Sequence, residues 1–164
     1  MELARALAEF DGKLTAPLRD VVAVFDDRDG ALLAELCHGT QAVAATWVVK
    51  ALLEDDRAGA LDLHRVFEAL GAAPHWEARL HLLQSVQHAP EAAMAQGFAI
   101  RGLLAHPKIL VRVWALDAFV RLALVDRGLL AEARELVSAA LDDRAASLRA
   151  RGRALQLVLD QSSA

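Results

Sequence analysis

The stretch that decides the fold is Val111-Arg112-Val113-Trp114-Ala115, because three other stretches of the chain align with it at nearly constant spacing. These are Gln41-Ala42-Val43-Ala44-Ala45, Trp76-Glu77-Ala78-Arg79-Leu80 and Leu148-Arg149-Ala150-Arg151-Gly152. The four begin at steps of 35, 35 and 37 residues, and each opens an apolar segment with helical periodicity. Each follows another helical segment that ends in leucine: Leu36, Leu70, Leu104 and Leu141. A pair of helices recurring with this period is typical of an α-solenoid, in which each pair packs against its neighbours.

The whole chain is predicted to be all-α, with about ten helices separated by glycine, proline or aspartate. We expect them at residues 2–10, 18–26, 30–38, 41–54, 61–71, 75–88, 92–105, 108–125, 129–142 and 145–160. No segment alternates as a β-strand does, and the short connections favour antiparallel neighbours. We therefore predict one domain over residues 1–164, a right-handed α-solenoid. Residues 30–160 form its four helix pairs, and residues 1–29 form a degenerate N-terminal cap.

The segment 108–125 is predicted to be the inner helix of a central pair. One face has the spacing of a buried helical stripe and comprises Val111, Ala115, Ala118, Phe119 and Leu122. The opposite side is also largely apolar, which indicates a helix between neighbours. We expect the guanidinium of Arg112 to reach a neighbouring carboxylate or the carbonyls that end an adjacent helix.

Residues 103–118 resemble a HEAT repeat. Leu103-Leu104-Ala105-His106-Pro107 matches an outer helix that ends in Leu-Leu before a short turn. Val111-Arg112 then opens the inner helix, with Ala115 three residues after the arginine. Residues 75–83 and 142–149 resemble the pattern more loosely, and the arginine position holds Ala42 and Glu77 in two units. The resemblance covers roughly residues 30–160 and implies a fold of HEAT-like repeats rather than a function. A tetratricopeptide solenoid, suggested by Gly128 and Glu132-Ala133, is the alternative.

The net charge of −4 is unevenly distributed. Residues 1–82 hold 8 basic and 14 acidic side chains, and residues 83–164 hold 10 and 8. An acidic chain has no overall electrostatic footprint for nucleic acid, so nucleic acid is an unlikely partner. Hydrophobic residues make up 55% of the chain. Some of them are expected to face a protein partner or a second copy, although abundant alanine at helix crossings is an equal explanation.

We expect a cytoplasmic protein without metal, cofactor or membrane span. The N-terminus has no basic region followed by an apolar stretch, and the apolar run 109–125 is interrupted by charges. The single cysteine, Cys37, lies in an apolar segment and is expected to be a buried, inert thiol. The six histidines lack the spacing of a metal-binding motif. The 15 arginines against 3 lysines suggest a GC-rich bacterial genome.

The candidate partner-binding residues lie on the inner helices. Trp114, Asp117 and Arg121 combine an aromatic side chain with a charged pair spaced for an i,i+4 ion pair. Arg149 and Arg153 share a face of the last helix, while Arg151 is expected to point away. The predicted function is a non-catalytic scaffold that binds a protein through its concave inner-helix surface. The alternative is an enzyme or nucleic-acid binder similar to the HEAT-like DNA glycosylases, which hold an alkylated base with tryptophan and aspartate on inner helices.

Overall fold

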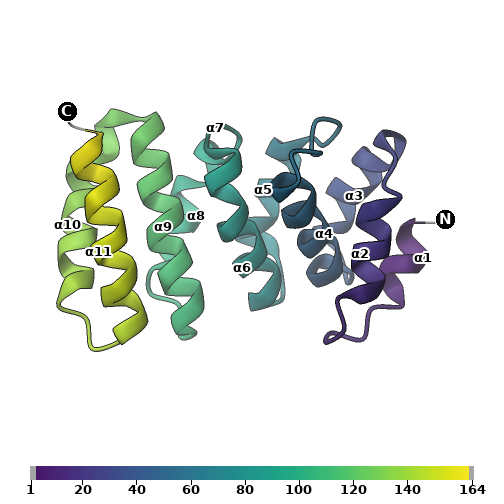
Figure 1. Ribbon diagram of the computed structural model, residues 1–164, viewed down its shortest axis with the longest axis horizontal. Coiled ribbons are helices and arrows are strands. Elements are labelled where there is room, and N and C mark those ends of the chain that lie inside the picture. Colours follow the sequence, from purple (N-terminus) through teal and green to yellow (C-terminus); the bar gives the residue numbers. More distant parts are fainter. Residues whose placement is uncertain (1–2, 163–164) are drawn as a thin grey trace. The chain divides into compact units, whose positions relative to one another are not determined.

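The computed structural model describes residues 3–162, and all the regular secondary structure in that range is helical, as predicted. The first elements are α1 (Leu3–Ala8), α2 (Ala16–Ala23), α3 (Gly30–Leu36), α4 (Ala42–Glu54), α5 (Leu63–Ala72) and α6 (Trp76–Ser85), with 3₁₀ turns η1 (Asp27–Asp29) and η2 (Val86–His88). The later ones are α7 (Pro90–Ala93), η3 (Met94–Gln96), α8 (Gly97–Leu103), α9 (Ile109–Val125), η4 (Arg127–Leu129), α10 (Leu130–Leu141) and α11 (Ala146–Gln161). Figure 1 labels the helices and colours them by their position in the sequence, from α1 in purple to α11 in yellow.

The tertiary contacts divide the chain into two compact units, which meet in the sequence between His88 and Ala89. Unit 1 contains α1 to α6 and unit 2 contains α7 to α11. In unit 1, α3 packs on α4, α5 on α6, and α4 on α6. In unit 2, α8 packs on α9, α10 on α11, and α9 on α11. The prediction of a single repeat domain over residues 1–164 remains a prediction.

Most helix boundaries follow the predicted segments, and local hydrogen bonds explain several of them. The side chain of Asp62 caps α5 by accepting from the N–H of Arg65, at 3.1 Å. After α4, Asp56 takes a left-handed conformation with φ of 55°. The N–H of Arg57 then donates to the carbonyl of Leu52 at 2.7 Å, and that of Asp56 to the carbonyl of Leu53. This is a Schellman motif with aspartate in the usual place of glycine.

The predicted helix 92–105 is wrong as a single element. It is divided into α7, η3 and α8, because the backbone tightens to 3₁₀ geometry at Met94–Gln96. Gln96 has φ of −95° and ψ of 10°, outside the α-helical region, and a new helix starts at Gly97. The start expected at residue 2 lies outside the described residues.

The predicted core face of α9 is confirmed, since Val111, Ala115, Ala118, Phe119 and Leu122 are all fully buried. Val113, Leu116 and Val120 on its other side are buried as well. Within unit 2, α9 contacts α7, α8, α10 and α11, which accounts for an apolar surface nearly all round. Gly152 of α11 lies where a Cβ atom would be only 3.3 Å from side chains of Ala140 and Leu141, so glycine permits the close packing of α10 on α11.

Candidate partner-binding surface on α9 and α11

The centre of the candidate surface is a carboxylate that is buried but fully paired. Asp117 of α9 is 1% exposed. Its Oδ1 accepts from Nε of Arg121, one turn further along α9, at 3.2 Å. Its Oδ2 accepts from Nη1 of Arg151, which lies on α11, at 3.1 Å. The predicted Asp117–Arg121 ion pair is therefore present, and a second arginine 34 residues after Asp117 completes it.

Trp114 lies one turn before Asp117 on the same face of α9 and is half-buried. The guanidinium carbon of Arg151 stands 4.3 Å from the centroid of the Trp114 ring. Arginine stacked on an aromatic face gains a cation–π interaction. Arg151 is thus held by a carboxylate on one side and an aromatic ring on the other. We call Trp114, Asp117, Arg121 and Arg151 the Asp117 cluster.

The cluster lies within a stripe of side chains along one face of α9, which is exposed at its two ends and buried at Asp117. Leu110, Trp114, Asp117, Arg121 and Val125 follow one another at steps of three or four residues and share one face of the helix. Leu110 and Val125, at the two ends of the stripe, are exposed hydrophobic side chains. The stripe therefore places apolar groups on both sides of a charged centre.

The two other predicted site residues on α11 do not join the cluster. Nη1 of Arg149 donates to the carbonyls of Asp143 at 2.8 Å and Arg144 at 2.9 Å. Arg149 therefore stabilises the turn that leads into α11. Arg153 is exposed. Arg151, which was expected on the other side of α11 from Arg149 and Arg153 and was not among the candidate site residues, is the α11 side chain that contacts Trp114 and Asp117.

A signal in the sequence could have identified Arg151. Trp114 and Arg151 are both the fourth residue of the aligned stretches that open α9 and α11. Equivalent positions on inner helices of successive repeats lie side by side when the repeats stack. The alignment of the two stretches therefore predicts that the side chains of Trp114 and Arg151 are neighbours.

Arg112 has the structural role expected of it. Its Nη2 donates to Oδ2 of Asp143 at 2.8 Å, which joins the start of α9 to the turn between α10 and α11. The N–H of Ala145 donates to Oδ1 of the same carboxylate at 2.8 Å. This backbone bond, with the charge of Arg112 beside it, lowers the pKa of Asp143 below its ordinary value.

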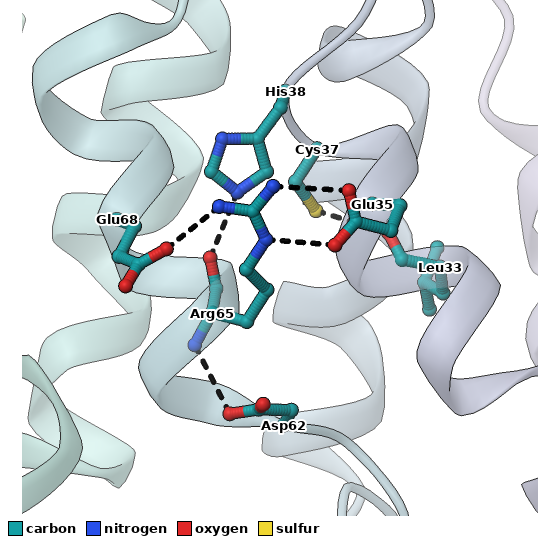
Figure 2. A network of polar contacts seen from close by, with 7 residues as sticks. All are labelled: Leu33, Glu35, Cys37, His38, Asp62, Arg65 and Glu68. Carbon is teal, nitrogen blue, oxygen red and sulfur yellow. Dashed lines mark hydrogen bonds and ion pairs between the residues drawn. The ribbon is translucent and has the colours of Figure 1, made fainter.

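Unit 1 contains a different arginine network, which joins α3 to α5 (Figure 2). Nε and Nη2 of Arg65 donate to the two oxygens of Glu35 at 2.7 and 3.0 Å, and Nη1 donates to Glu68 at 2.7 Å. His38 adds a bond from Nε2 to the carbonyl of Arg65, at 2.8 Å. The hydrogen bonds from Arg65 hold the pKa of Glu35 below its usual value. In this network a single guanidinium group, that of Arg65, donates to two carboxylates, those of Glu35 and Glu68.

A neutral pair of side chains joins α4 to α6 in unit 1. Thr46 of α4 is fully buried, and its hydroxyl donates to the carbonyl of Ala42 at 2.7 Å. The hydroxyl oxygen therefore accepts from Nδ1 of His81 on α6, at 3.2 Å. Burial, assisted by the charge of Lys50, lowers the pKa of His81 to about 4. His81 is consequently neutral at physiological pH.

Three further features of residues 3–162 bear on function: possible metal ligands, the single thiol and possible membrane spans. No group of three or more His, Cys, Asp or Glu side chains in residues 3–162 is arranged to hold a metal ion. Cys37 is fully buried, donates to the carbonyl of Leu33 at 3.3 Å, and has a pKa raised to about 12 by burial, which confirms the expected inert thiol. None of the helices described is long and apolar enough to cross a membrane.

Comparisons of the chain with models of protein families, with curated proteins and with solved structures find no match.

Proposed function

We propose that this protein is a non-catalytic scaffold that binds a protein partner through the stripe of side chains on α9 and the adjoining side of α11. The observation that carries the proposal is the half-buried ring of Trp114, held by Arg151 beside the paired Asp117. A rigid aromatic group next to an arginine is the combination most enriched among residues that dominate binding energy. Leu110 and Val125 extend the apolar area on both sides.

We also propose that the helix pairs are HEAT-like repeats of a right-handed α-solenoid, with α4, α6, α9 and α11 as inner helices. Polar links between successive inner helices support this, because they span nearly one repeat in each unit. Thr46 and His81 are 35 residues apart, and Asp117 and Arg151 are 34 apart. The ion pairs that link successive outer helices also have similar sequence separations in the two units, 30 residues for Glu35–Arg65 and 31 for Arg101–Glu132. In this proposal the partner lies on the concave side, in the cytoplasm.

The second candidate is a nucleic-acid-binding enzyme similar to the HEAT-like DNA glycosylases. It is favoured by the meeting of tryptophan, aspartate and arginine on inner helices. However, both oxygens of Asp117 accept from guanidinium groups, so this carboxylate would first have to release an arginine before it could activate water or stabilise a cationic intermediate. The pairing of Asp117 therefore favours the binding function.

The test compares two aromatic side chains of unit 2. Wild-type protein, Trp114→Ala and Phe98→Ala serve as bait in a pull-down with quantitative mass spectrometry, and Kd is then measured with the purified partner by calorimetry. Phe98 is the matched control, because it is 88% exposed and lies on α8. We expect Trp114→Ala to weaken binding roughly tenfold or more, as for an interface anchor, and Phe98→Ala to leave it within about twofold.

Equal binding of wild-type protein and a folded Trp114→Ala variant would contradict the proposal. Loss of binding in Phe98→Ala alone would move the partner site to α8. Tight, salt-sensitive binding of duplex DNA that is lost in Trp114→Ala would favour the second candidate.

A further inference from the structure

We infer that the Asp117 cluster is an anion-binding site that receives a carboxylate side chain from an acidic segment of the partner protein. This inference rests on the proposed function and specifies the chemistry of the partner. The inference is based on the ratio of positive to negative groups in the cluster, since the guanidinium groups of Arg121 and Arg151 share the single carboxylate of Asp117. One positive charge in the cluster is therefore left without a counterion.

The two arginines retain donors that face solvent. Arg121 bonds to Asp117 only through Nε, and Arg151 only through Nη1. The remaining nitrogens of both side chains make no hydrogen bond within residues 3–162, and none of them is among the buried atoms without a partner. Each side chain is 29% exposed. Several guanidinium N–H groups thus point outward in fixed positions and are available to an acceptor.

The two guanidinium groups are also close enough to act on one ligand. Each bonds to a different oxygen of the same carboxylate, at 3.2 and 3.1 Å, so the bonded nitrogens lie at most about 8.5 Å apart. A second carboxylate arriving from solvent can accept from both, since arginine presents its donors as a planar fork. Asp117 acts as a positioning residue, because it orients both forks and shields their mutual repulsion.

The surrounding charges favour an acidic ligand. The helices α9 and α11 carry five arginines, namely Arg112, Arg121, Arg149, Arg151 and Arg153, against Asp117 and Asp160, and Asp143 beside them pairs with Arg112. The inner helices of unit 1 are balanced, with Lys50 and Arg79 against Glu54 and Glu77. The local excess on α9 and α11 therefore attracts anions selectively.

A protein carboxylate fits this surface better than a nucleic-acid backbone. The 10 basic and 8 acidic residues after Ala89 leave unit 2 with a net charge of only +2, whereas affinity for a phosphate backbone requires many neutralised phosphates. The stripe also supplies apolar side chains, namely the half-buried Trp114 within the cluster and the exposed Leu110 beside it. The expected ligand is thus an acidic residue with an aliphatic or aromatic neighbour.

The inference is tested by fluorescence anisotropy with three labelled probes: an oligoglutamate peptide that contains a leucine, the same peptide with glutamine in place of glutamate, and a short DNA duplex. We expect the glutamate peptide to bind, the glutamine peptide not to bind, and the affinity to fall as salt is added.

Arg121→Gln is the principal variant, because it removes the excess charge and leaves the Asp117–Arg151 pair to support folding. We expect it to weaken binding of the glutamate peptide roughly tenfold, the effect of losing a charged hydrogen bond. Arg127→Gln, which removes an exposed charge from η4, is the matched control and should change Kd by less than about twofold.

The outcomes separate this inference from the proposed function. Partner binding that depends on Trp114 while Arg121→Gln and the glutamate peptide have no effect would overturn the inference and leave the function standing. Peptide binding that depends on Arg121, without any effect of Trp114→Ala on the partner, would overturn the function and leave the anion site. Tighter binding of DNA than of the glutamate peptide, lost in Arg121→Gln, would overturn the inference in favour of nucleic acid.

Discussion

The Arg65 network of unit 1 and the Asp117 cluster of unit 2 contain the same kinds of side chain in opposite proportions. In unit 1 one guanidinium bonds to two exposed glutamates, and Nε, Nη1 and Nη2 all have a partner (Figure 2). In unit 2 one buried carboxylate bonds to two arginines that keep outward donors. The first arrangement engages all three nitrogens of Arg65 and has one negative charge in excess, whereas the second has one positive charge in excess and nitrogens without a bond to the cluster. The ratio of arginines to carboxylates, together with the burial of the carboxylate, therefore decides whether an ion-pair network only links helices or also offers a binding site.

The largest expected effect is the loss of stability on replacing a buried phenylalanine, which allows the cores of the two units to be compared. Phe67 in unit 1 and Phe119 in unit 2 are both fully buried. Replacing either by alanine should lower the free energy of unfolding by about 3–5 kcal/mol, measured by denaturant titration, because a large cavity is left behind. A loss below about 1 kcal/mol in one unit would show that its core repacks and that the two units differ in more than their polar groups.

Asp117→Ala should have the next largest effect. The change removes the buried partner of two arginines, and we expect a loss of about 3 kcal/mol in the same titration, since breaking a buried ion pair leaves charge uncompensated. Glu35→Ala in unit 1 is the matched control and should leave the melting temperature unchanged within error, because its ion pair is exposed. Equal losses in the two variants would show that burial does not distinguish the networks.

The neutral Thr46–His81 pair predicts a dependence on pH in unit 1. The pKa of His81 is about 4 in the folded protein and is close to 6.5 in an unfolded chain. The folded state disfavours protonation, so stability is complete above pH 6.5 and is lost as the pH falls towards 4. We expect about 3 kcal/mol in total, with a slope of at most about 1.4 kcal/mol per pH unit.

Denaturant titrations at several pH values check this dependence. His81→Gln should remove the slope between pH 6.5 and 4, whereas His88→Gln, a change at an exposed position, should retain it. An unchanged slope in His81→Gln would assign the pH dependence to other groups.

The smallest effect is expected for Arg65→Gln. Although this side chain makes three charged hydrogen bonds, its ion pairs are exposed to water and screened by salt. The melting temperature should change by no more than the error of the measurement at moderate salt. A clear drop that persists at high salt would mean that the network of unit 1 stabilises the fold as strongly as the Asp117 cluster.

Much of the secondary structure and of the core could be predicted from the sequence, because both depend on short-range periodicity. The spacing of Val111, Ala115 and Phe119 identified a face that is fully buried. Arg112 was correctly expected to bond to a neighbouring carboxylate. The division of residues 92–105 was missed, since apolar spacing does not report the local tightening at Gln96.

The candidate site shows the limit of the same reasoning. The Asp117–Arg121 pair was predictable because its i,i+4 spacing lies on one helix. Arg151 was left out of the candidate site in favour of Arg149 and Arg153, and the burial of Asp117 was not foreseen. A helical wheel gives the order of side chains around the axis of one helix only. It does not tell which neighbouring helix lies opposite each face.

By itself the sequence determined most of the helices and the apolar face of α9, because these properties follow from periodicity and local hydrogen bonding. Only the tertiary structure decided that Asp117 is buried, that Arg151 reaches it from α11, and that Trp114 lies under the same guanidinium. The physical reason is that these contacts join residues more than 30 positions apart. Their formation depends on how closely two packed helices approach, which packing of the whole unit fixes.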